Sequence, residues 1–263
     1  MCGKKHNSIF WENEKDRIIK SYLNGETTSD IAKTYECDRS TILRHLKEWN
    51  VPIKNKERYN GVYKTDIHYF SKIDTEEKAY WIGLLLADGH ISKQGVLSLC
   101  MKDLDMIEKL KKSLKSEHPI KKDRYGNPCI YIGCKQYYED LTSIGFHNRK
   151  SYYIDLDRVL SNIPKELIHH FVRGLFDGDG SIRVYNYEYL NKPQYHFGIT
   201  GLENVCEFVK DYLNIDRKLI KESEITYTCV TRDLNKIKEI YQKLYSNATI
   251  YMDRKYIIFK NII

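Results

Sequence analysis

The sequence predicts an α+β fold in which a small all-helical domain precedes two pseudo-symmetric lobes, each running αββαββα. Three observations lead to this prediction. Apolar residues recur at helical spacing within the first 53 residues. Two segments, GLLLADGHI (83–91) and GLFDGDGSI (174–182), match in Gly, Leu, Asp, Gly and Ile at a separation of 91 residues. Each segment is followed by the same order of extended and helical patterns.

Composition excludes several classes of protein. The 263 residues include 43 Lys or Arg and 36 Asp or Glu, and 41% are hydrophobic, which is enough to bury a core. The longest apolar run, residues 80–87, is far shorter than the roughly 20 residues of a membrane helix, and the first residues lack the apolar stretch of a secretion signal. We expect an intracellular protein, in the cytoplasm, the nucleoid or an organelle, with no membrane partner.

Cysteine and tyrosine usage narrows the class of binding partner. Seven cysteines form no Cys-x-x-Cys pair, which favours buried thiols over disulfides or zinc ligands. The chain has 22 tyrosines and a net charge of +7. Tyrosine packs as an aromatic and keeps a polar tip, so basic charge with many tyrosines indicates nucleic acid, with a solvated basic surface as the alternative.

The N-terminal domain, residues 1–53, is predicted to hold three helices over 14–24, 27–35 and 39–49, a helix-turn-helix pattern. The segments DIAK (30–33), DRSTILRHL (38–46) and NVPI (50–53) resemble the resolvase-like helix-turn-helix family. The resemblance implies that the third helix enters the DNA major groove by its first residues, with a protein-binding module as the alternative. The DNA contacts predicted here are Arg39, Ser40, Thr41 and Arg44.

Residues 54–73 are expected to be a basic linker, followed by lobe 1 at 74–150 and lobe 2 at 151–263. A period of 91 residues is too long for a solenoid and fits a pair of α+β lobes. In lobe 1 we expect an extended stretch at 91–101, a helix at 104–114, a hairpin turning at 125–128 and a helix at 136–144. In lobe 2 we expect extended stretches at 181–187 and 195–200, a helix at 202–213, a hairpin at 219–231 and a helix at 233–245.

Small residues mark one face of each repeated helix. Gly83 and Ala87 lie four residues apart, as do Gly174 and Gly178. Glycine inside a helix costs about 1 kcal/mol relative to alanine, so a packing reason is needed. We expect these four residues to form a helix interface in which the two backbones touch, by analogy with small-residue packing in membranes.

Each repeated helix is followed by Asp-Gly. We expect Gly89 and Gly180 to stop the helices in the left-handed conformation, leaving Asp88 and Asp179 at the negative ends of two helix dipoles. Close packing brings these like charges together, which requires a cation. Mg²⁺, with Mn²⁺ as a substitute, is the usual partner of two carboxylates and phosphate oxygens. An Asp-Gly pair taken alone is more often a simple turn signal.

The segments WIGLLLADG (81–89) and VRGLFDGDG (172–180) resemble the LAGLIDADG motif of homing endonucleases. The resemblance covers residues 74–260 and, with two copies in one chain, is to the monomeric two-repeat branch. It implies a saddle whose sheets line the DNA major groove, with the motif helices at its centre. It also implies a metal site at Asp88 and Asp179, in which we include Ala87 and Gly178. The first copy departs from the motif at Leu86, where the family has Asp.

Phosphodiester hydrolysis needs an attacking water, a Lewis acid and help for the leaving oxygen, and metal ions at the two aspartates can supply all three. One carboxylate from each lobe gives one centre per strand, and the family implies a double-strand break with short 3′ overhangs. Lys135 and Arg232 follow the last hairpin strand of each lobe, so they are the candidate catalytic cations, with Gln136 as a further candidate. Capping of a helix by a surface cation is the alternative for both.

Extended stretches supply the candidates for groove contact. Residues two apart on a strand share a face, so Arg183, Tyr185 and Tyr187 point the same way and can reach base edges. The basic runs at 109–112 and 236–243 are expected to be solvated helix faces. The other predicted DNA-binding residues are Lys93, Lys102, Lys121, Lys122, Arg124, Lys192, Tyr195, Lys218 and Lys221.

These inferences predict a monomeric, site-specific endonuclease that hydrolyses double-stranded DNA at a long target and belongs to an intron, an intein or a free-standing invasive gene. Two alternatives stay open. One is a transcription regulator that keeps the fold without cleavage, against which the presence of both Asp88 and Asp179 argues. The other is a maturase that binds intron RNA, which the two acids do not exclude.

Overall fold

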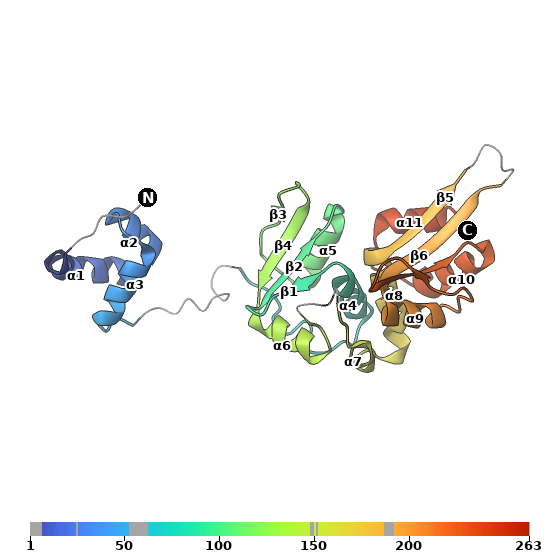
Figure 1. Cartoon of the computed structure of the whole chain (residues 1–263), viewed down its shortest axis with the longest axis horizontal. Coiled ribbons are helices and arrows are strands. Elements are labelled where there is room, and N and C mark those ends of the chain that lie inside the picture. The colour runs from blue at the N-terminus through green and yellow to red at the C-terminus, as the bar shows by residue number, and fades with distance from the viewer. Residues whose placement is uncertain are drawn as a thin grey trace. The chain divides into compact units, whose positions relative to one another are not determined.

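The structure is a computed structural model that describes residues 7–24, 26–52, 63–147, 150, 152–186 and 192–262. The chain divides into two compact units, residues 1–58 and residues 59–263. Each unit has its own hydrophobic core, and Figure 1 shows the elements of both.

The N-terminal unit is a set of three helices, α1 (Ser8–Leu23), α2 (Thr28–Thr34) and α3 (Arg39–Glu48). The first helix begins six residues earlier than predicted because the Asn7 side chain accepts a hydrogen bond from the Phe10 N–H and caps it. The core of this unit is apolar and aromatic. That these helices form a DNA-binding motif stays a prediction. The buried core residues are Trp11, Ile18, Tyr22, Ile31, Ala32, Ile42, Leu46 and Val51.

Lobe 1 follows the predicted αββαββα order. It opens with α4 (Glu76–Ala87) and continues through β1 (His90–Ile91) and β2 (Val96–Cys100) to α5 (Leu104–Ser113). The strands form an antiparallel sheet in the order β1-β2-β4-β3. The remaining elements are β3 (Lys121–Lys122), β4 (Pro128–Gly133) and α6 (Lys135–Ser143).

Lobe 2 repeats this order, with its sheet running β5-β6-β8-β7. The matching topology confirms the predicted α+β fold of two pseudo-symmetric lobes. A short helix α7 (Leu156–Ser161) and a 3-10 turn (Lys165–Leu167) precede the repeat, and α11 (Asp253–Lys260) follows it; none of these three was predicted. The repeated elements are α8 (Ile168–Asp179), β5 (Gly180–Tyr185), β6 (Gln194–Leu202), α9 (Glu203–Tyr212), β7 (Ile220–Lys221), β8 (Thr226–Thr231) and α10 (Leu234–Tyr245).

Helices cover one face of each sheet (Figure 1). Successive side chains of β5 point to opposite faces of the sheet, so Ile182 is buried under the helices whereas Arg183 is exposed. On β6, Phe197 and Ile199 are buried in the same way. The opposite face of each sheet has no helix among the described residues and carries polar side chains.

Two expectations are wrong, one on the conformation of the motif glycines and one on the cysteines. The motif glycines do not adopt the left-handed conformation, because Gly180 is extended and the only glycines with positive φ among the described residues are Gly95, Gly126 and Gly145. Gly89 and Gly180 serve close approach instead, since a Cβ would lie 2.6 Å from the Leu85 side chain and 2.3 Å from that of Phe176, respectively.

The cysteines are not all thiols, since Cys100 and Cys129 form a disulfide. The two residues are register partners on β2 and β4, with Cα atoms 4.1 Å apart, and spacing along the chain carries no signal for such a pairing. The described cysteines outside this pair are free. No helix in the described part of the chain is long and apolar enough to cross a membrane.

Candidate active site

The two motif helices cross backbone to backbone at the glycines. A Cβ on Gly83 would lie 2.0 Å from the Phe171 carbonyl oxygen of α8, and one on Gly174 would lie 2.1 Å from the Tyr80 carbonyl oxygen of α4. The reciprocal contacts describe a crossing with local two-fold symmetry. Further along, a Cβ on Gly178 would lie 2.3 Å from the Cβ of Ala87. The structure thus brings together all four small residues that the sequence assigns to a helix interface.

This crossing carries Asp88 and Asp179 to the same end of the helix pair. The Asp88 Oδ2 atom reaches across to α8, 3.4 Å from where a Cβ of Gly178 would stand. Burial, and then the negative charge of Asp88, raise the pKa of Asp179 to about 6. Burial also raises the pKa of Asp88. Both residues remain open to solvent on one side, so a ligand can reach the carboxylates from there.

Two lysines that the sequence analysis did not select lie near the aspartates. Lys150 donates to the carbonyl oxygens of Leu86, at 2.7 Å, and Ala87, at the end of α4. Lys255, on α11, donates to four carbonyl oxygens at the end of α8. Burial lowers the pKa of both lysines, that of Lys255 to about 8, while the two aspartates act in the opposite direction. Each lysine satisfies carbonyl groups that the helix leaves free and faces the aspartate pair.

A local signal for these lysines exists in the sequence. Both occur in an Arg-Lys pair, at 149–150 and 254–255, and each pair follows the last helix of its repeat. The spacing from that helix differs between the repeats, seven residues after α6 and ten after α10, so a search at fixed offsets overlooks the match.

A buried carboxylate holds the helix that carries Lys255. Asp177 is fully buried and accepts hydrogen bonds of 2.8 Å from Tyr80, from Tyr245 and from the Met252 N–H at the start of α11. Its counterpart in the first repeat is Leu86, so lobe 1 lacks this anchor. Asp177 therefore ties α4, α8 and α11 together next to the aspartate pair.

The donor set fits a hard divalent ion. Among the described residues, no group of three or more His, Cys, Asp or Glu side chains is placed to hold a metal, so the site offers two carboxylates. Mg²⁺ commonly takes one or two protein carboxylates and completes its shell with water and substrate phosphates. The carbonyl oxygens of Ala87 and Gly178, included in the predicted metal site, accept hydrogen bonds from Lys150 and Lys255.

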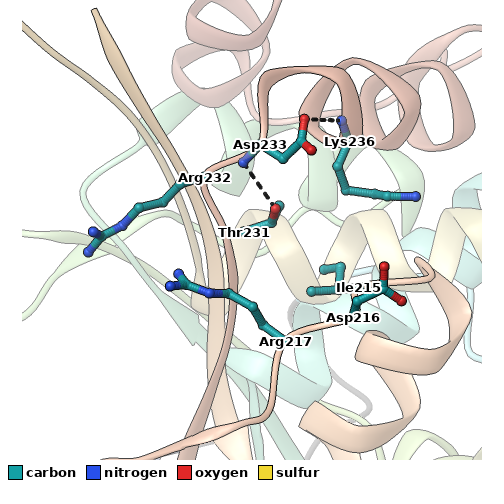
Figure 2. A pocket seen from close by; sticks show the side chains of 7 residues that line it. All are labelled: Ile215, Asp216, Arg217, Thr231, Arg232, Asp233 and Lys236. Atoms are coloured by element: carbon teal, nitrogen blue, oxygen red, sulfur yellow. Dashed lines mark hydrogen bonds between the residues drawn. The ribbon is translucent and has the colours of Figure 1, made fainter.

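The predicted cations Lys135 and Arg232 lie elsewhere. Lys135 is exposed at the start of α6 and forms an ion pair of 3.2 Å with Glu139, and Gln136 donates to Asp140 at 2.8 Å. Arg232 lines a pocket beside α10 (Figure 2). The two positions are not equivalent, because Lys135 follows the helix cap Cys134 whereas Arg232 precedes the cap Asp233. The cations that act on the Asp179 charge are Lys150 and Lys255.

The predicted DNA-binding residues of the lobes lie on strands and turns with exposed side chains, apart from the half-buried Tyr185 and Tyr195; Tyr187 lies outside the described residues. In the N-terminal unit, Arg39 donates to Thr28 at 3.1 Å and Arg44 lies 3.4 Å from a ring nitrogen of His45. Ser40 is exposed and Thr41 is half-buried. The exposed residues predicted in the lobes are Lys93, Lys102, Lys121, Lys122, Arg124, Arg183, Lys192, Lys218 and Lys221.

Solved structures of similar fold include LAGLIDADG proteins bound to DNA. The I-LtrWI LAGLIDADG homing endonuclease bound to target DNA superposes with a TM-score of 0.52 at 16% identity, covering 74% of this chain and 90% of that one. The LAGLIDADG meganuclease I-AabMI bound to uncleaved DNA gives 0.53 at 13% identity, covering 70% and 89%. The two-lobed unit has the LAGLIDADG fold.

Sequence comparison adds two relatives, both from Methanocaldococcus jannaschii. The replication factor C small subunit is 27% identical over 220 residues, which cover 64% of this chain and 11% of that protein. Reverse gyrase is 24% identical over 240 residues, covering 88% and 13%. This chain thus spans about a tenth of the length of the relatives it matches. No protein-family model matches it.

Proposed function

We propose that this chain is a site-specific endonuclease that hydrolyses both strands of double-stranded DNA with a divalent metal ion held by Asp88 and Asp179. One observation carries the proposal: two carboxylates, one from each lobe, meet at the end of a helix crossing, where Asp88 raises the pKa of Asp179. An arrangement that keeps two repelling acids together and open to solvent is suited to bind a cation and an anionic substrate at the same point.

The residues of the site divide the work. Bound Mg²⁺ would supply a Lewis acid at the scissile phosphate and an activated water. Asp88 and Asp179 would hold it and fix its position between the lobes. Lys150 and Lys255 bring two positive charges to the same end of the helices, where they would stabilise the extra charge on phosphate during hydrolysis.

The open faces of the two sheets are the proposed DNA-binding surface. Exposed cations such as Lys121 on β3, Arg183 on β5 and Lys221 on β7 lie on the strands, where they would contact phosphates and base edges. The helices of the N-terminal unit would extend the footprint through the start of α3. Both lobes come from one chain, so a monomer would supply both aspartates.

The comparisons support an origin in an invasive element. Two proteins with different names each contain a stretch similar to this chain, and that stretch is about a tenth of each of them. A segment shared in this way fits an element that inserts into different genes. We therefore keep an intein or intron as the proposed source.

The test is cleavage of a duplex library of random sequence in Mg²⁺, with sequencing of the cut ends. We expect a narrow set of sites, no cutting in EDTA, and a loss of at least about a hundredfold in rate for Asp88→Asn and for Asp179→Asn. Glu108→Gln, which removes an exposed acid on α5, is the control and should cut normally. Tight sequence-specific binding without cutting would refute the nuclease and favour the regulator.

A further inference from the structure

Lobe 2 contains a pocket lined largely by charged residues, away from the aspartate pair, shown in Figure 2. It lies between the loop after α9 and the junction of β8 with α10, and its volume is about 310 Å³. The residues that line it are Ile215, Asp216, Arg217, Thr231, Arg232, Asp233 and Lys236.

Of the five charged residues that line the pocket, Asp233 and Lys236 have direct partners and Asp216 acts on the charge of Lys236, which leaves the two arginines. Asp233 caps α10 by accepting from the Asn235 and Lys236 N–H groups, and the Lys236 ammonium pairs with Glu239 at 2.5 Å. Arg217 and Arg232 make no ion pair with any described residue, and both are exposed. Figure 2 shows their guanidinium groups extending to the same side of β8. Two like charges placed together in this way favour an anion.

The arginine pair lies at one end of a basic row across the open face of the sheet. Arg183 on β5 is the register partner of His196 on β6, and the pairing of Phe197 with Thr231 places Arg232 next to His196. Burial, and then the charges of Arg232 and Arg183, lower the pKa of His196. The Nδ1 atom of His196 is buried and has no hydrogen-bond partner among the described residues. Arg183, His196 and Arg232 therefore form a row of basic residues, while Asp216 and Asp233 line the pocket at its end.

The described residues of lobe 1 place no matching pair of arginines at this position. When the caps Cys134 and Asp233 are matched, His118 stands in place of Arg217 and Gly133 in place of Arg232. In lobe 1 the chain around Tyr63 and Lys64 also packs at this position. The Tyr63 ring lies 5.2 Å from that of His118, and the Glu117 N–H donates to the Lys64 carbonyl oxygen at 2.9 Å. In the described part of the chain, the pair of arginines therefore belongs to lobe 2.

We infer that Arg217 and Arg232 together bind one backbone phosphate of the DNA strand that lies on lobe 2. This inference rests on the proposed function and adds Arg217, a residue that sequence analysis did not select. Guanidinium groups suit this ligand because they form paired, charge-assisted hydrogen bonds with phosphate oxygens. The bound phosphate would lie at the rim of the sheet, in line with Arg183. This contact would position the DNA strand and would not read a base.

The experiment measures affinity for a fluorescent 40-base-pair duplex of random sequence, in EDTA, as a function of KCl concentration. Each phosphate neutralised contributes about 0.9 to the slope of log K against log salt. We expect Arg217→Gln to reduce the slope by about one, and Arg217→Lys to keep it because the charge remains. Lys260→Gln removes an exposed cation from α11 and should leave the slope unchanged.

The double variant Arg217→Gln with Arg232→Gln tests the shared phosphate. If both arginines bind one phosphate, the double variant loses about one from the slope rather than two. An unchanged slope in Arg217→Gln overturns the inference, and so does an additive loss of two. If the unaltered protein binds the duplex with no salt dependence, DNA is not its substrate and the proposed function fails as well.

Discussion

Single residues at the helix ends set the charge balance of this site. Burial raises the pKa of both Asp88 and Asp179, the charge of Asp88 raises that of Asp179 further, and the charges of Lys150 and Lys255 lower both. Each lysine donates hydrogen bonds to carbonyl groups at the end of a motif helix and also interacts with the charges of the two carboxylates. An added divalent ion would therefore stabilise the site and, through it, the fold.

The pKa of Asp179 predicts how stability depends on pH in metal-free protein. An acid whose pKa is raised to about 6 on folding contributes stability below its unfolded value of 3.8, and that contribution is lost as the pH rises through 6. Asp179→Asn stays neutral, so it should raise the melting temperature in EDTA at pH 7.5. Screening by solvent reduces the effect to about 2 °C. Thermal melts at pH 7.5 and pH 4 measure it.

At pH 4 the carboxyl group of Asp179 is largely protonated, and the two proteins should melt together. Added Mg²⁺ should reverse the order by stabilising the unaltered protein alone. A variant that melts below the unaltered protein at pH 7.5 in EDTA would show that this aspartate is not strained.

At the scale of elements, α4 and α8 pack with no space for a side chain at their crossing. Gly83→Ala places a methyl group 2.0 Å from the Phe171 carbonyl oxygen, so the helices must separate. Overpacking of this kind costs about 3 kcal/mol, and here the neighbouring atom is backbone. The free energy of unfolding, from urea titration, measures the loss.

Gly201→Ala is the matched control because a Cβ there meets its nearest atom at 3.9 Å, an ordinary contact. It should change stability by less than about 1 kcal/mol. Equal stability of the two variants would mean that the helices can separate at little cost.

The same pair of helices is asymmetric in its polar contacts. Arg173 is fully buried on α8 and pairs with Glu76 of α4 at 2.7 Å, while its counterpart on α4 is Ile82. Tyr80 donates to Asp177, whereas the counterparts of these two residues are Phe171 and Leu86. One half of the crossing is thus polar and the other apolar. This difference favours α4 against α8 over a pairing of either helix with a copy of itself.

Glu76→Gln tests this polar half. It leaves the Arg173 guanidinium buried without its ionic partner, and losses of this kind are about 3–5 kcal/mol. We compare the free energies of unfolding of Glu76→Gln and Glu108→Gln, the second of which removes an exposed acid on α5. The comparison distinguishes loss of the ion pair from loss of a charge. If both variants were equally stable, the ion pair would contribute nothing to holding the lobes together.

At the scale of the whole molecule, two separate cores imply two independently folded units. A chain limited to residues 63–263 should keep its own unfolding transition. If both units bind the same DNA, removing the first should weaken binding by about a hundredfold, since tethered sites raise effective concentration. Titration of the library-selected duplex with both chains measures it. Equal affinities would show that α1 to α3 do not bind DNA.

Sequence alone determined the features that repeat within a short stretch of chain. Gly83, Ala87 and Asp88 recur as Gly174, Gly178 and Asp179, because helical spacing places small residues on one face and an acid at the end. The order of strands and helices followed from local periodicity in the same way. Only the tertiary structure decided which cations stand at the site, which cysteines pair and where a groove stays open. Lys150 and Asp177 contact carbonyl and hydroxyl groups more than 60 residues away in sequence, and the local Arg-Lys pair at 149–150 does not record these contacts, because they exist only once the chain has folded.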